Sequence, residues 1–149
     1  MDVLAVVLRW LHIVPAVVAG GGSIFMAVAL LPALRELPDD ARRAAREKIT
    51  ARWRGIVMAC ITLLLLSGLT NFFLYQAPAH KGQLLYQALF GAKFLAAMAV
   101  FFIASALIGR SAALQPIRDN VRFWAGLNAS LVLVILLLSG ILRNIGAGH

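Results

Sequence analysis

The stretch that decides the fold runs from Phe123 to Leu142, FWAGLNASLVLVILLLSGIL, and contains no Asp, Glu, Lys or Arg. Two other stretches share this property, Trp10 to Leu34 and Gly55 to His80. A fourth, Ala88 to Gly109, is interrupted only by Lys93. About 20 helical residues, each rising about 1.5 Å, cover the roughly 30 Å hydrocarbon layer of a bilayer. The sequence therefore predicts an all-α bundle of four transmembrane helices.

The composition also indicates a membrane protein. The chain has 149 residues, of which 62% are hydrophobic and 13% charged, whereas about 25% of a soluble domain is charged. Its mean hydropathy is +0.88. We expect a single integral membrane domain over residues 1–149, with helices at about 4–34, 55–76, 86–109 and 123–143. This leaves no room for a soluble catalytic domain, so any chemistry must lie among the helices.

The basic residues are concentrated in two loops. Arg35 to Arg54 holds seven Lys and Arg residues against four acids, and Arg110 to Arg122 holds three more of the fourteen in the chain. By the positive-inside rule both loops are cytoplasmic and both termini lie outside a bacterial inner membrane. The net charge of +8 thus reflects topology and predicts no nucleic-acid partner. In the first loop, the acidic start predicts a short surface helix capped by Asp39 or Asp40.

A weak internal repeat relates the two halves of the chain. LLLSGLTN from Leu64 to Asn71 matches LLLSGILRN from Leu136 to Asn144. The preceding helices then align so that His12 and Lys93 occupy equivalent positions. The pattern predicts two repeated helical hairpins.

Ionisable side chains inside spanning helices point to a functional site, because inserting each one into the membrane costs about 2.5–3.5 kcal/mol on insertion scales. Arg9 and His12 lie in the outer half of the first helix, and Lys93 lies at a similar depth in the third. Asn71 ends the second helix and Arg143 lies near the outer end of the fourth. We expect these five residues to form a cofactor-binding site in the outer leaflet, with His12 as its metal ligand.

The first helix has two irregular features near His12. Pro15 removes a backbone hydrogen bond and leaves the carbonyl of Leu11 needing a partner. Small residues from Ala16 to Ser23 share the face of His12, which suits either close helix packing or a flat bulky group. The triple glycine Gly20–Gly22 favours packing over a hinge.

Haem b or a related tetrapyrrole is the first cofactor that these residues suggest. Neutral imidazole ligates haem iron, and Arg or Lys in the same leaflet can pair with the propionates. Only His12 lies inside the membrane, since His80 is in the outer loop and His149 ends the chain. The iron would be five-coordinate, would take a Met or another weak ligand, or would be shared across a homodimer.

Copper is the alternative cofactor, because Met, His and Cys suit it. No two of these residues stand at an i, i+3 or i+4 spacing in the helices. A quinone or the head group of an anionic membrane lipid is a third possibility, since Arg9, Lys93 and Arg143 attract anions.

The chain resembles, over nearly its whole length, the four-helix membrane proteins grouped around the copper-resistance D (CopD) domain and the HemJ-type protoporphyrinogen oxidases. The segments that carry the resemblance are Leu8–His12, Gly20–Gly22 with Pro32, Ser67–Gly68 and Leu89–Lys93. The resemblance implies haem or copper handling, with a redox role such as protoporphyrinogen oxidation, and it implies that His12 and Lys93 are functional. Copper transport or resistance is one alternative function. A structural subunit of a larger membrane complex is another.

Overall fold

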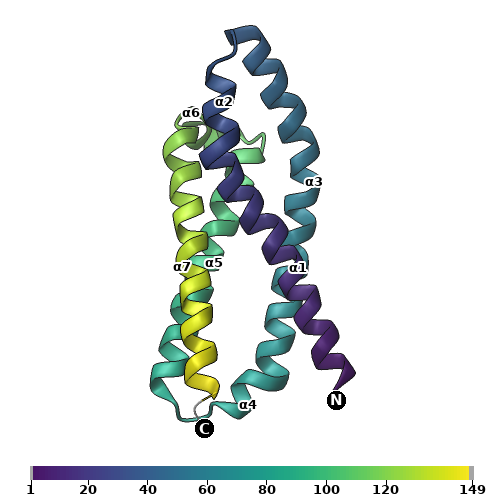
Figure 1. The fold of residues 1–149 in the computed structure, drawn as a ribbon, viewed down its shortest axis with the longest axis vertical. Coiled ribbons are helices and arrows are strands. Elements are labelled where there is room, and N and C mark those ends of the chain that lie inside the picture. The colour runs from purple at the N-terminus through teal and green to yellow at the C-terminus, as the bar shows by residue number, and fades with distance from the viewer. Residues whose placement is uncertain (1, 148–149) are drawn as a thin grey trace.

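The computed structural model describes residues 2–147, and those residues form helices and connecting turns with no strand. The first helical rod comprises α1 (Val3–Phe25), the π-helical η1 (Met26–Leu30) and α2 (Leu31–Arg35). The second comprises α3 (Asp39–Asn71), the π-helical η2 (Phe72–Gln76) and α4 (Ala77–Ala79). Then follow α5 (Leu84–Ile108), the short η3 (Ala112–Leu114) and α6 (Gln115–Asp119), and α7 (Val121–Ala147). Figure 1 shows this order.

Four helical segments are long and apolar enough to cross a membrane: Val3–Arg35, Asp39–Ala79, Leu84–Ile108 and Val121–Ile145. They also turn large apolar side chains outward, such as Val17 and Leu95, which are 67% and 70% exposed. An apolar exterior is favourable in lipid and unfavourable in water. The prediction of an all-α, four-helix, multi-pass membrane protein is confirmed.

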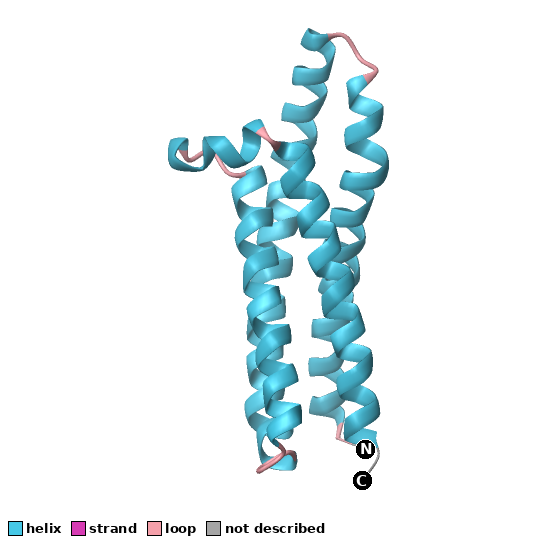
Figure 2. Ribbon diagram, turned by 90° about the vertical axis from the view of Figure 1, so that its left-hand side faces the viewer, coloured by secondary structure: helices cyan, strands magenta, loops and turns pink. Residues whose placement is uncertain are grey.

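The four helices associate as two pairs. α1 packs chiefly against α3 and α5 chiefly against α7, whereas contacts between the pairs are fewer. The two ends of the described chain lie at one end of the bundle, here called the terminal end (Figure 1). The α2–α3 connection lies at the opposite end, here called the loop end, and it projects beyond α5 and α7 (Figure 2). This is the arrangement of two helical hairpins that the repeat predicts.

The second helix starts earlier than the sequence suggested. The expected bounds, 55–76, cover only the apolar part of a rod that begins at Asp39. No Gly or Pro interrupts residues 39–54, so nothing ends the helix before it enters the membrane. The predicted short surface helix was therefore wrong. So was its cap, because Pro38 occupies the N-cap position and no side chain bonds there, although Asp39 and Asp40 do lie in the first turn.

The basic residues of the loop end cap the last turn of α5. The final carbonyls of a helix lack a partner within the helix. Arg54 donates to the carbonyl of Ile108 from Nε at 2.9 Å and from Nη2 at 2.7 Å. Arg118 donates to the carbonyl of Ala106 at 3.3 Å, and Arg46 donates to the carbonyl of Arg118 at 3.4 Å. Arg54 and Arg46, both on α3, therefore join the first hairpin to the second, whereas Arg118 fixes α6 to the end of α5 within the second.

The triple glycine serves packing, as predicted. A Cβ atom at Gly22 would lie 2.3 Å from two ring carbons of Trp53 on α3. One at Gly20 would lie 3.1 Å from Val132 on α7, and one at Gly21 would meet nothing within 4 Å. α1 thus approaches α3 and α7 through two of its three glycines.

Candidate functional site

His12 lies between α1 and α3, where a serine fixes its ring. The side chain is half-buried, and its Nδ1 lies 3.1 Å from Oγ of Ser67, which is only 3% exposed. Ser67 has one hydroxyl hydrogen, and its nearest acceptor is the carbonyl of Leu63 at 2.5 Å. With that hydrogen donated to Leu63, the serine oxygen accepts from Nδ1–H. Nε2 is then the unprotonated nitrogen, and no hydrogen bond reaches it from the described residues.

The same serine meets the free carbonyl created by Pro15. Ser67 Oγ lies 3.4 Å from the carbonyl oxygen of Leu11, the atom that loses its helical partner because Pro15 has no N–H. The expected unpaired acceptor thus has a polar neighbour on α3. This places the irregular turn of α1 directly beside His12.

Gly68 provides the space for the imidazole. A Cβ atom at this position would lie 3.1 Å from Cε1 and 3.4 Å from Nδ1 of His12. The Ser67–Gly68 pair therefore has two roles, since the serine orients the ring and the glycine lets it approach α3. Sequence reasoning noted the pair only as part of the repeat and of the resemblance, because nothing local to a leucine-rich helix connects it with a residue 55 positions earlier.

The arrangement of Ser67 and Gly68 around a histidine is not repeated in the second hairpin. In the second hairpin, the Ser139 hydroxyl donates to the carbonyl of Ile135 at 2.7 Å and bonds to no other described residue, and a Cβ atom at Gly140 would meet no described atom within 4 Å. Among the described residues, the matching Ser-Gly pair on α7 therefore orients no side chain, and the arrangement of serine, glycine and histidine occurs in the first hairpin alone.

Lys93 supplies a positive charge to the same region. It is half-buried on α5, and its positive charge acts on the imidazole of His12. The only ion pair among the described residues joins Arg42 and Asp39 at the loop end, so no carboxylate in that part of the chain neutralises Lys93. A cation within apolar helices requires an anion or water nearby. The site therefore combines an available imidazole nitrogen with an unneutralised cation.

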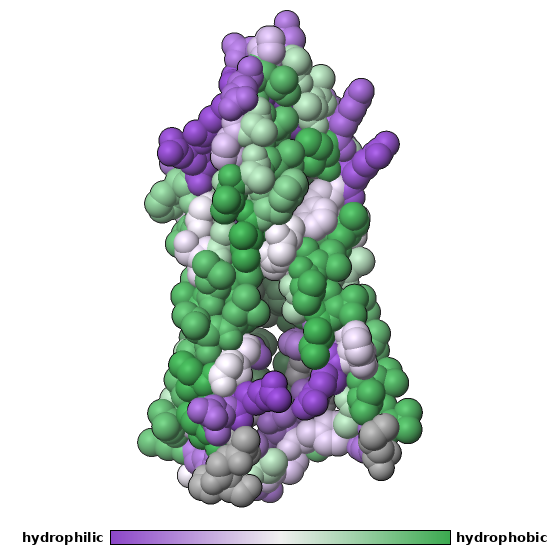
Figure 3. Space-filling model, viewed as in Figure 1, coloured by the Kyte–Doolittle hydropathy of each residue, from purple (hydrophilic) through white to green (hydrophobic). Residues whose placement is uncertain are grey.

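The other three predicted site residues are less closely connected. Arg9 and Arg143 are exposed and Asn71 is half-buried, four residues beyond Ser67 on α3. Among the described residues, no hydrogen bond or ion pair joins any of them to His12 or Lys93. Hydrophilic side chains nevertheless gather around an opening between the two helix pairs toward the terminal end (Figure 3).

Other metal-binding side chains lie elsewhere. The ring of His80 lies against the ring of Tyr86, tilted by 33° with centroids 3.7 Å apart, and Tyr86 donates to Gln76 Oε1 at 2.6 Å. His80 follows Ser67 by 13 residues, or roughly 20 Å along a helix at about 1.5 Å per residue, too far to share an iron with His12. Cys60 is buried on α3, and residues 2–147 contain no group of three or more His, Cys, Asp or Glu that could hold a metal.

No known family model matches the chain, and no curated protein or solved structure was found to be similar to it.

Proposed function

We propose that this protein binds haem b or a related tetrapyrrole between its two helix pairs, with His12 as the axial ligand. The observation that carries the proposal is the hydrogen bond between Nδ1 of His12 and Ser67, which leaves Nε2 free to coordinate. Ligating histidines are commonly held through their second nitrogen in this way, which fixes both tautomer and orientation.

The charge near His12 supports an anionic ligand. Lys93 lies in the electrostatic range of the imidazole and has no carboxylate partner among the described residues. The cation would repel a bare metal ion, whereas a porphyrin brings its own propionates to pair with it. Arg9 and Arg143, both exposed, are available for a second propionate. Haem, when bound, would supply one-electron redox chemistry, and the chain's own residues would bind, orient and neutralise it.

The alternatives have less support. Copper would need several soft or nitrogen ligands, and His12 has no Cys, Asp or Glu cluster around it in the described part of the chain. The hypothesis of a purely structural subunit does not explain why Ser67 and Gly68 both accommodate the imidazole of His12.

The absorption spectrum of the purified protein, as isolated and after addition of haemin, tests the proposal. We expect a Soret band that His12→Ala abolishes and that Cys60→Ala, which removes a buried side chain elsewhere on α3, preserves. A protein that stays colourless with haemin present contradicts the proposal. So does stoichiometric copper by mass spectrometry, or co-purification with a larger complex that His12→Ala leaves unaffected.

The redox role requires a separate test. We propose a protoporphyrinogen-oxidase-like activity. We expect the wild-type chain to rescue growth of a strain that cannot oxidise protoporphyrinogen, and we expect the His12→Ala variant not to rescue it. If the wild type fails to rescue while the Soret band is present, the enzyme activity is wrong and tetrapyrrole binding stands.

A further inference from the structure

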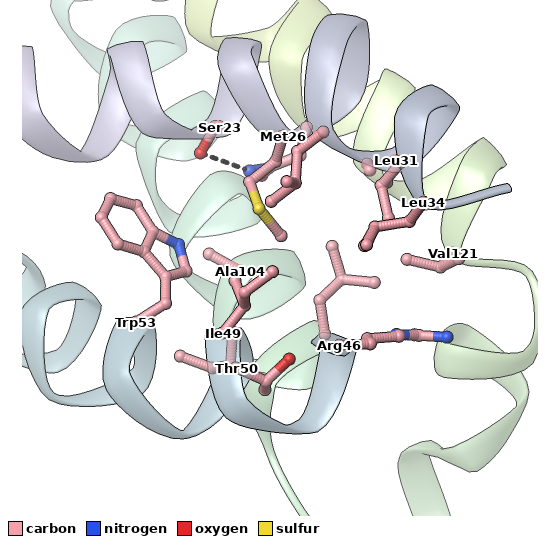
Figure 4. A pocket seen from close by; sticks show the side chains of 15 residues that line it. Ser23, Met26, Leu31, Leu34, Arg46, Ile49, Thr50, Trp53, Ala104 and Val121 are labelled. Carbon is pink, nitrogen blue, oxygen red and sulfur yellow. Dashed lines mark hydrogen bonds between the residues drawn. The ribbon is translucent and has the colours of Figure 1, made fainter. Parts of the chain in front are cut away.

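A second polar site lies nearer the loop end, independent of His12. There, residues of α1, η1, α2, α3, α5 and α7 line a cavity of about 50 Å³. Its wall is mainly apolar and includes Met26, Leu31 and Ala104, with polar groups from Ser23, Asn128 and Thr50 (Figure 4). The guanidinium of Arg46 points away from this space, toward Val121 (Figure 4).

Asn128 has an unsatisfied polar group in this cavity wall. The residue is 3% exposed, its amide nitrogen donates to Ser23 Oγ at 3.1 Å, and its Oδ1 has no partner within the described residues. Exchanging the amide oxygen and nitrogen would not remove the problem. The oxygen would then accept from Ser23, and the NH₂ group would be the one without a partner. Buried amides normally have their hydrogen bonds satisfied, by protein or by ordered water.

Two donors in the cavity wall are also unused. Ser67, Ser130 and Ser139 each donate to the carbonyl one turn earlier in their helices, whereas Ser23 makes no such bond among the described residues. The indole nitrogen of Trp53 lies on the side of its ring that faces the cavity (Figure 4), and no described residue accepts from it. The cavity therefore presents both donors and an acceptor.

We infer that this cavity holds a small cluster of ordered water molecules, hydrogen-bonded to Asn128 and Ser23 within the membrane-spanning bundle. A water molecule needs roughly 10–15 Å³ of such space and two to four polar partners, so the cavity has room for a few. The mixture of donors and an acceptor favours water over a metal cation, which would be ligated by acceptors alone. The cavity also adjoins η1, and π-helical turns often occur at functional sites.

Hydroxyl-radical footprinting of the full chain in nanodiscs tests this inference, because radicals form from water at the site. We expect Met26, in the cavity wall, to be oxidised several-fold faster than Met58, which is exposed toward the lipid. Asn128→Leu should reduce the rate at Met26 to that of Met58. Ser130→Ala, a change on the same helix outside the cavity, should leave it unchanged.

Two results would overturn the inference. One is a wild-type rate at Met26 no higher than that at Met58, which needs no variant and so holds even if Asn128→Leu fails to fold. The other is fast oxidation of Met26 that persists in folded Asn128→Leu, since the water would then not depend on the amide.

Discussion

Replacing Gly22 by Ala tests the packing of α1 against α3. Carbon atoms in contact lie about 3.5–4.0 Å apart, whereas the new Cβ would lie 2.3 Å from Cη2 and Cζ2 of Trp53. The overlap exceeds 1 Å, and the neighbour is a rigid ring on another helix. Overpacking of this kind costs about 1–3 kcal/mol. Gly21→Ala is the matched control, because it makes the same chemical change one residue away in open space.

The comparison removes the effect of helix propensity, since both variants gain roughly 0.5–1 kcal/mol from replacing glycine. We expect Gly22→Ala to be less stable than Gly21→Ala by about 1–3 kcal/mol. Gly20→Ala should fall between them, because its Cβ would lie 3.1 Å from Val132 Cγ1. Equilibrium unfolding in mixed micelles, followed by circular dichroism and tryptophan emission, measures the difference. Equal stability of the Gly22 and Gly21 variants would refute the close approach.

Three further predictions concern the ends of the bundle and the site. Arg54→Ala should lower the free energy of unfolding by about 1–3 kcal/mol, because it leaves the last carbonyl of α5 without its two donors; an unchanged denaturation curve argues against this cap. A hydrogen bond from Tyr75, and then one from the backbone N–H of Ala5, keep the pKa of Asp2 below its ordinary value. The stabilisation from the Asp2 carboxylate is therefore present at pH values above its ordinary pKa and is lost as the pH falls through the lowered pKa. Asp2→Asn should accordingly flatten the acid side of a plot of melting temperature against pH. An acid side identical to that of the wild type would contradict the contact between Asp2 and Tyr75. Gly68→Ala should displace the imidazole and weaken haemin binding roughly tenfold in a Soret titration, and wild-type affinity would show that the ring needs no such space.

Hydrophobicity alone predicted the four helices, because a bilayer imposes both length and apolarity on any segment that crosses it. The boundary at 55 was wrong because hydropathy detects where a helix enters the membrane and not where it begins. Residues 39–54 continue the same helix beyond its apolar part, and only their lack of Gly and Pro indicated it.

Part of the site was also predictable from the sequence. The cost of polar groups in lipid singled out His12 and Lys93, and the backbone chemistry of Pro15 predicted an acceptor at Leu11 in need of a neighbour. The identity of that neighbour depends on how α1 and α3 are rotated about their axes, which no local pattern specifies. For the same reason, the contact between Ser67 and His12 became evident only from the structure.

Pulsed EPR of the ferric haem complex, prepared with ¹⁵N-histidine, tests the central claim most directly, because it detects the nitrogen bound to the iron. The account predicts coupling to one axial imidazole nitrogen in the wild type and its loss in His12→Ala. An iron without an axial imidazole, or a coupling that His12→Ala leaves unchanged, would contradict it.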